Sequence, residues 1–168
     1  MGKNTQTKVN REFSSGGVVF RKFSDEIKWL VSASTPSKLY PEIRWRLPKG
    51  RIDDMGNDTP GPMARGEVRA DEVSLQNGAL REVREEGGVE ARVIKKIGSE
   101  KYFFNSKDRG RILKFVTFYL MEWKKDLPEG FGPETSEVLW LPFEEAKKKL
   151  SFGGEKQILK KAKDILAS

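Results

Sequence analysis

The chain of 168 residues contains neither cysteine nor histidine. Without cysteine the protein can form no disulfide and no zinc–thiolate site, and it has no thiol nucleophile. Without histidine no imidazole can serve as a general base or as a metal ligand. Any catalysis must therefore use carboxylates, lysine, tyrosine, serine or a hard metal ion.

Long apolar runs are also missing. No stretch approaches the ~18 apolar residues that a membrane helix needs, and the first residues lack the apolar core of a secretory signal. We therefore expect a cytoplasmic protein without a membrane partner.

Charge is abundant, at 34% of residues, and the net charge is +7. This balance favours a polyanionic ligand such as nucleotide phosphates or an inositol phosphate, although many basic domains are simply soluble.

The order of the expected elements indicates a mixed α/β domain. Strand-like patterns occupy residues 13–23, 27–34, 45–47, 89–99, 102–104, 112–123 and 138–141. Helical patterns occupy residues 74–86, 143–150 and 155–166, the first with Ser74 as a candidate N-cap and Gly87-Gly88 at its end. We expect residues 1–10 to be a flexible lead-in and residues 11–168 to be one domain. A loop insertion at about 54–72, rich in Gly, Pro and Asp, would interrupt it.

The helix predicted at residues 74–86 carries a cluster of acids. Glu82, Glu85 and Glu86 stand at i, i+3 and i+4, so their carboxylates share one side of the helix. Like charges at this spacing repel one another, and a cation among them would reverse the sign. Because no histidine or cysteine is available, a hard, oxygen-preferring ion such as Mg²⁺ or Mn²⁺ is indicated.

The position of these acids on the helix supports a metal site. Leu75, Ala79 and Val83 form the apolar stripe, and Glu82 and Glu86 point beside it rather than away from it. A carboxylate that is partly buried needs a partner. The alternative is an ordinary acidic helix, neutralised by neighbouring arginines and lysines.

Two segments together resemble the signature of the Nudix hydrolases: LPKG at residues 47–50 and REVREEGGV at residues 81–89. The segments SSGGVVF and VLWLPFEEAKKKL are also similar to this family. The resemblance implies an α/β fold (α+β), a Nudix-type α/β/α sandwich with a mixed central sheet and helices on both sides. Within the family, REFSSGGVVF, WRLPKGRI and ILKFVTFYLMEW look most like the bacterial diadenosine polyphosphate (Ap4A-type) hydrolases.

The resemblance also implies an activity, the cleavage of a phosphoanhydride bond in a dinucleoside polyphosphate with Mg²⁺ (or Mn²⁺) as cofactor. A nucleoside triphosphate or inositol pyrophosphate hydrolase is a second interpretation. A catalytically inactive domain that binds nucleotide or RNA is a third. We expect a monomer or homodimer and no nucleic-acid partner.

The resemblance assigns roles to individual residues. The expected metal ligands are Gly50, through its carbonyl, with Glu82, Glu85 and Glu86; Arg81 belongs to the same signature. The general base would be Glu82 acting through water, or Glu137 ahead of the last strand, which could equally be a solvated loop acid. The candidate substrate contacts are Lys49, Arg51, Arg44, Arg46, Lys156 and the rings of Trp45 and Tyr102. Most single basic residues serve only solubility, and most rings pack in a core.

The chain departs from the signature in one place. Gly50 to Val89 spans 40 residues, 17 more than is usual, and the extra residues fall between Asp53 and Ser74. Val73 stands where the signature has a glutamate that pairs with the arginine. Glu72 or Glu67 is the candidate to pair with Arg81 in its place. The alternative is that neither does and that the signature is catalytically weakened.

Overall fold

A mixed sheet of seven strands lies at the centre of the computed structural model, which describes residues 10–52 and 61–168. The strands are β1 (Asn10–Phe23), β2 (Glu26–Ser34), β3 (Trp45–Arg46), β4 (Lys49–Arg51), β5 (Val89–Ser106), β6 (Gly110–Asp126) and β7 (Thr135–Leu141). Their order is β3-β2-β1-β6-β5, with β4 paired to β1 and β7 to β2. β1 and β6 run parallel, whereas β5 pairs with β6 in the antiparallel direction.

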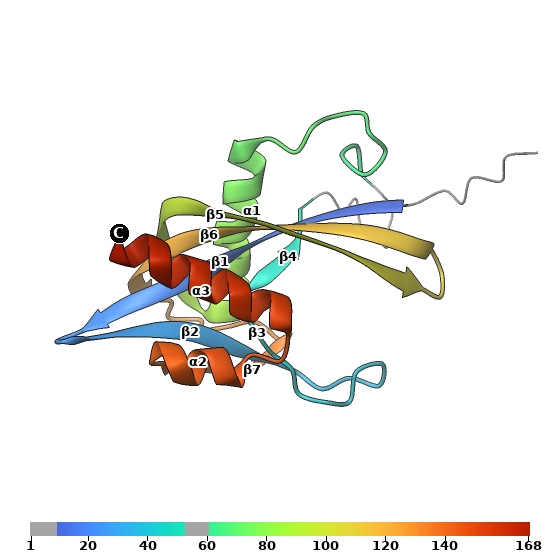
Figure 1. Ribbon diagram of the computed structural model, residues 1–168. Coiled ribbons are helices and arrows are strands. Elements are labelled where there is room, and N and C mark those ends of the chain that lie inside the picture. The colour runs from blue at the N-terminus through green and yellow to red at the C-terminus, as the bar shows by residue number, and fades with distance from the viewer. Residues whose placement is uncertain (1–9, 53–60) are drawn as a thin grey trace, which may run out of the picture.

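Helices cover both faces of this sheet (Figure 1). α1 (Glu72–Gly87) packs on one face, and α2 (Phe143–Lys149) and α3 (Gly153–Ala167) pack on the other. This arrangement confirms the predicted α/β/α sandwich with a mixed sheet. None of the helices in the described residues is long and apolar enough to cross a membrane.

The core consists of two apolar layers, one on each face. Along β1, Val18 and Phe20 join the layer beneath α2 and α3, whereas Val19 joins the layer beneath α1. Successive side chains of a strand point to opposite faces, and β1 is therefore apolar on both. This strand therefore lies between α1 on one face of the sheet and the C-terminal helices on the other.

The prediction was wrong in two places along the strands. Residues 89–106 form one long strand, β5, with register shifts against β6, where two separate strands were expected. The expected strand at residues 45–47 is instead two short strands, β3 and β4. Between them Pro48 lacks an amide hydrogen, and the Leu47 N–H donates to the Glu155 carboxylate (2.6 Å) instead of to a strand.

The first helix begins earlier than predicted, because Asp71 and not Ser74 is its N-cap. Asp71 has extended backbone angles, and its carboxylate accepts hydrogen bonds from the Ser74 N–H (2.8 Å) and hydroxyl (2.9 Å). Part of the expected insertion, residues 53–60, lies outside the described residues, as do residues 1–9 of the expected lead-in. Asn10, which was placed in that lead-in, belongs to β1.

The N-cap gives a test of the helix boundary. Replacing Asp71→Ala removes the acceptor for the first turn of α1, so the midpoint of thermal unfolding should fall by roughly 2–4 °C. Ser74→Ala keeps the N–H that the cap receives and should lower the midpoint less. Circular dichroism at 222 nm measures both. If Ser74→Ala lowered the midpoint more than Asp71→Ala does, Ser74 would be the N-cap, as the sequence predicted.

Candidate active site

The acidic helix α1 lies with two of its carboxylates turned toward the sheet. Glu82 and Glu86 are only 7% and 3% exposed, while Glu85 is exposed to solvent. The stripe of Leu75, Ala79 and Val83 is buried against the sheet, as the spacing predicted. Glu82 and Glu86, which lie beside that stripe, are therefore buried with it. The alternative interpretation, an ordinary acidic face exposed to solvent, does not apply to these two residues.

Glu82 lies directly against the backbone of β4. A Cβ atom on Gly50 would sit 2.2 Å from Cδ of Glu82, which is closer than any real contact. Only glycine lets the strand and the carboxylate come this close. Burial raises the pKa of Glu82, and the negative charge of Glu85 raises it further. The structure thus brings together two of the predicted ligands, Gly50 and Glu82.

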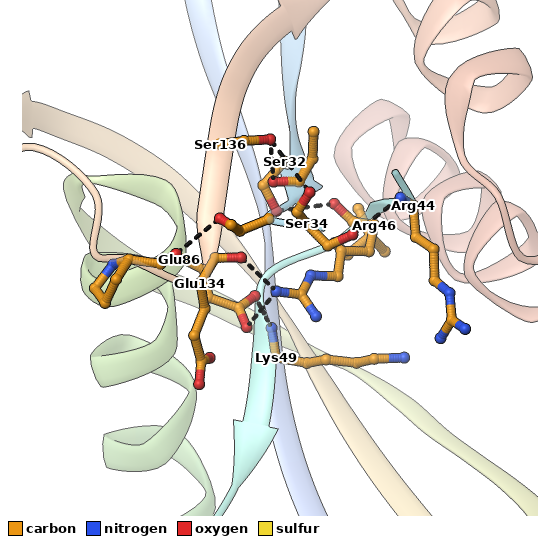
Figure 2. Close-up of polar contacts among 12 residues, drawn as sticks. Ser32, Ser34, Arg44, Arg46, Lys49, Glu86, Glu134 and Ser136 are labelled. Atoms are coloured by element: carbon orange, nitrogen blue, oxygen red, sulfur yellow. Dashed lines mark hydrogen bonds and ion pairs between the residues drawn. The ribbon is translucent and has the colours of Figure 1, made fainter. Parts of the chain in front are cut away.

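Glu86 is held by the segment that contains β3 and β4. Its Oε2 accepts a hydrogen bond from the Lys49 backbone N–H (3.1 Å), and its Oε1 lies 3.3 Å from Nη2 of Arg46. Figure 2 shows the Lys49 side chain extending away from Glu86 while its backbone faces it. Burial nevertheless raises the pKa of Glu86 to about 7, because Arg46 offsets only part of the cost and Glu82 and Glu134 add repulsion.

The donor set fits a hard divalent cation. In residues 10–52 and 61–168, no three acidic side chains are close enough together to form a metal cage by themselves. Mg²⁺, however, binds through one or two carboxylates, with water and other oxygens completing its shell. Glu82 and Glu86 repel each other when ionised, and a cation would relieve that repulsion.

The loop before β7 supplies a fourth acid, and it is Glu134 instead of Glu137. Glu137 lies inside β7, exposed, opposite Ala33 of β2. Glu134 lies beside the helix: its carbonyl accepts from Arg46 (3.4 Å), and its charge raises the pKa of both Glu82 and Glu86 (Figure 2). The acid of this segment that lies near the glutamates is therefore three positions before the predicted Glu137.

A buried ion pair fixes the strand segment to α3. Glu155 is 1% exposed, and its carboxylate accepts from the Leu47 N–H and from Nζ of Lys49 (2.9 Å). Burial opposes the charge on Lys49, but the attraction of Glu155 outweighs it and raises the Lys49 pKa. Lys49, predicted as a phosphate contact, is therefore committed to Glu155. The sequence did not single out Glu155, because a lone glutamate in the first turn of a helix resembles any surface acid.

Three cations surround one buried carboxylate next to β4. Glu12 is 6% exposed and lies 3.0 Å from Nη2 of Arg109, 3.2 Å from Nζ of Lys114 and 3.7 Å from Nε of Arg51. Burial lowers the pKa of Lys114, and Lys49 and Arg51 lower it further against the pull of Glu12. Arg109 and Lys114 alone carry more charge than the one carboxylate between them. Only Arg51 was predicted, because the parallel pairing of β1 with β6 that joins Glu12 to Lys114 is not visible in the sequence.

The other predicted substrate residues lie around this region without converging on one point. The Arg44 guanidinium stacks on the Tyr40 ring at 4.0 Å. Trp45 and Tyr102 are partly buried against the core, as most rings are. Lys156 is partly exposed in the first turn of α3.

Neither candidate partner pairs with Arg81. Glu72 accepts from the Tyr119 hydroxyl (2.8 Å) and from Nζ of Lys96 (2.5 Å). Glu67 pairs with Arg65 at 2.9 Å. The expectation that one of them replaces the missing glutamate was therefore wrong. Arg81 donates instead to the Arg51 carbonyl (3.1 Å) and lies 3.7 Å from the Glu82 carboxylate.

Comparison with known proteins agrees with this geometry. The model of the NUDIX domain matches residues 14–162. A Mycobacterium tuberculosis (strain CDC 1551 / Oshkosh) protein described as mutator protein MutT4 is 29% identical over 117 residues, which are 70% of this chain. The chain spans only 46% of that relative's length.

Solved structures share the fold. A Caenorhabditis elegans Ap4A hydrolase binary complex has a TM-score of 0.63 at 21% identity, covering 93% of this chain and 98% of that one. The NUDIX domain of Shewanella oneidensis NrtR complexed with ADP ribose has a TM-score of 0.64 at 16% identity, covering 98% and 94%. A MutT protein from Methanosarcina mazei Go1 has a TM-score of 0.61 at 13% identity, covering 96% and 99%. At these identities the likeness concerns the fold.

The buried acid Glu86 predicts how stability depends on pH without metal. Its pKa is raised from 4.5 to about 7, so the folded protein holds a proton that the unfolded chain releases. The stabilisation is complete below about pH 4.5 and is lost as pH rises through about 7, by a few kcal/mol at most.

Thermal unfolding in EDTA between pH 4.5 and 8 measures this loss. Glu86→Gln should flatten the decline, and Mg²⁺ should restore stability near pH 8 in the unmutated chain but not in Glu86→Gln. Glu144→Gln, on the exposed side of α2, is the matched control. A profile identical in all three proteins would show that Glu86 ionises normally.

Proposed function

The chain belongs to the NUDIX hydrolase family, enzymes that act on pyrophosphate bonds, and on this premise we propose that it is a divalent-metal-dependent pyrophosphohydrolase. The proposed substrate is a dinucleoside polyphosphate. The observation that carries the proposal is the pair of buried carboxylates, Glu82 and Glu86, packed against the Gly50 backbone with raised pKa values. Strongly perturbed carboxylates held in this way are typical of functional sites.

The residues proposed to hold the cation are Gly50, Glu82, Glu85 and Glu86. Mg²⁺, or Mn²⁺, bound there would neutralise phosphate charge and supply hydroxide near neutral pH. The protein's own contribution is to fix the carboxylates before the substrate arrives. Arg46 and the Lys49 N–H orient Glu86, and Glu155 holds the segment from which they come. Such supporting contacts commonly decide metal affinity and activity.

The cationic group around Glu12 supports a substrate with several phosphates. Arg51 follows Gly50 directly in β4, so its backbone adjoins a proposed metal ligand, while its side chain points to Glu12 on the other face of the sheet. Arg109 and Lys114 already outnumber the Glu12 carboxylate, and guanidinium groups match phosphate oxygens well. This arrangement favours a polyphosphate chain. The same cations would also suit an inositol pyrophosphate or a nucleoside triphosphate, which is the second candidate.

Glu134 is the residue that we propose as general base. It comes from a loop rather than from the metal-binding helix, and it lies near Glu82 and Glu86 without being buried. An exposed acid can approach a water molecule on the side of the substrate that the helix leaves open. Glu82 acting through water is the alternative. Glu137 is a weaker candidate because it lies within β7, opposite Ala33 of β2.

Removing one buried ligand tests the catalytic assignment. Glu86→Gln keeps the size of the side chain but removes its charge, so hydrolysis of diadenosine tetraphosphate with Mg²⁺ should fall by roughly 100-fold or more. Chromatography of the products from diadenosine tetraphosphate, nucleoside triphosphates and an inositol pyrophosphate measures activity and preference together.

Glu144→Gln is the control and should retain full activity. Undiminished turnover by Glu86→Gln, or turnover in EDTA, would refute the catalytic assignment. A preference for triphosphates would replace the proposed substrate. Nucleotide binding in EDTA with no product under any metal would instead identify an inactive binding domain.

Gly50 separates activity from folding. The added Cβ of Gly50→Ala meets the end of the flexible Glu82 side chain, so Glu82 should swing aside and the fold should survive. We expect roughly 10-fold to 100-fold lower activity and a midpoint of unfolding within a few degrees of the parent. Gly153→Ala is the matched control, because a Cβ there meets nothing within 4 Å. Equal activity of the two variants would show that Glu82 need not approach β4.

A further inference from the structure

A cavity of about 620 Å³ opens on the solvent side of α1. One wall is the outer stripe of the helix, with Asn77, Leu80 and Arg84, and the other is the segment before β7, with Phe131. Glu85, the exposed acid of the proposed metal site, forms part of the lining. This volume lies within the range of small-ligand pockets in proteins.

The cavity is built by fixed backbone contacts. The Leu127 N–H donates to the Gly88 carbonyl (2.9 Å), and the Gly132 N–H donates to the Glu85 carbonyl (2.6 Å). Gly88 ends α1 with φ 69°, and a Cβ there would lie 2.8 Å from the Phe131 nitrogen. Glycine at this position lets the segment close over the end of the helix. The wall that carries Phe131 is therefore anchored at both ends.

The lining combines an unused cation with an exposed ring. Within the residues that the structure describes, the Arg84 guanidinium has neither an ion-pair nor a hydrogen-bond partner. Arg81 also lines the cavity; its side chain is 52% exposed and has only the 3.7 Å contact with Glu82 and the bond to the Arg51 carbonyl. The Phe131 ring is 40% exposed, although large apolar side chains are usually covered.

The cavity adjoins the proposed metal site through Glu85, which is a proposed ligand and part of the lining. Arg81 also lines the cavity and lies 3.7 Å from the carboxylate of Glu82, a second proposed ligand. A polyphosphate chain held by a cation at Glu85 therefore has one end at the mouth of the cavity. The moiety that arrives there would meet a guanidinium, an amide and an apolar ring.

We propose that this cavity is the subsite for one nucleoside monophosphate end of the substrate. Its base packs between Phe131 and Leu80, and its phosphate contacts Arg84. Phe131 offers a π-face that any base can use, and Asn77 offers an amide for the base edge. The inference rests on the proposed function, because the remaining phosphates must lie at the cation that Glu85 would hold. It makes Arg84 and Phe131 determinants of preference for substrates that carry a nucleoside.

Steady-state kinetics on two substrates tests the subsite. With diadenosine tetraphosphate, Phe131→Ala and Arg84→Gln should each raise KM by roughly 5-fold to 100-fold, with kcat within about twofold. With an inositol pyrophosphate, which carries no nucleoside, KM should stay unchanged. Phe131→Tyr keeps the ring and should restore the KM of the parent. Arg92→Gln, an exposed arginine of β5 paired with Glu122, is the matched control.

Two results would overturn the subsite. One is an unchanged KM for diadenosine tetraphosphate in both variants. The other is an equal loss on both substrates, which would assign Arg84 and Phe131 to the structure of the helix. Calorimetric titration with AMP separates this proposal from the proposed function. If the chain hydrolyses no dinucleotide, binding of AMP that weakens at least about fivefold in Arg84→Gln but not in Arg92→Gln retains the subsite. AMP binding equal in both would remove it.

Discussion

The approach of α1 to β4 is the contact on which the other features of the site depend. Glu82 fits against β4 only because Gly50 has no side chain there. Glu86 is held beside it by a hydrogen bond from the Lys49 backbone N–H. Burying two carboxylates of like charge is unfavourable in itself. The fold sustains it with Arg46 on one oxygen of Glu86 and a backbone donor on the other. The resulting pair is incompletely neutralised, and such a pair gains most from a cation.

The segment of β3 and β4 must therefore be held firmly, and it is held from both faces of the sheet. On one face it meets α1 through Glu86. On the other, Glu155 of α3 accepts from Leu47 and Lys49. Removing a partner from a buried ion pair costs far more than a surface pair does. The C-terminal helix, distant in sequence from the acids, is in this way part of what positions them.

Local patterns were sufficient for the fold and for the acidic helix, and insufficient for the partners of its acids. The spacing of Leu75, Ala79 and Val83 correctly placed Glu82 and Glu86 beside the core. Arg46 and the Lys49 N–H, which hold Glu86, come from a segment well before the helix, and the ion pairs next to β4 join residues still farther apart. Glu12 and Lys114 meet through parallel pairing across about a hundred residues, and a parallel register has no local turn to reveal it. The sequence prediction named Glu137 and missed Glu134, because the residue at which β7 begins, Thr135, lies between the two acids and is not marked by a local pattern.

The absence of the usual glutamate at position 73 changes how the helix is secured without removing the need to secure it. Val73 is 69% exposed. The start of α1 is tied down one residue earlier, where Glu72 accepts from the Tyr119 hydroxyl and from Lys96, and Gly88 and the segment after β6 hold its other end. A helix fixed at both ends keeps its acids in place without a pairing partner for Arg81. Arg81 instead donates to the Arg51 carbonyl and lines the outer cavity. Where the signature has an ion pair between this arginine and a glutamate, the chain therefore has an exposed cation beside the acids.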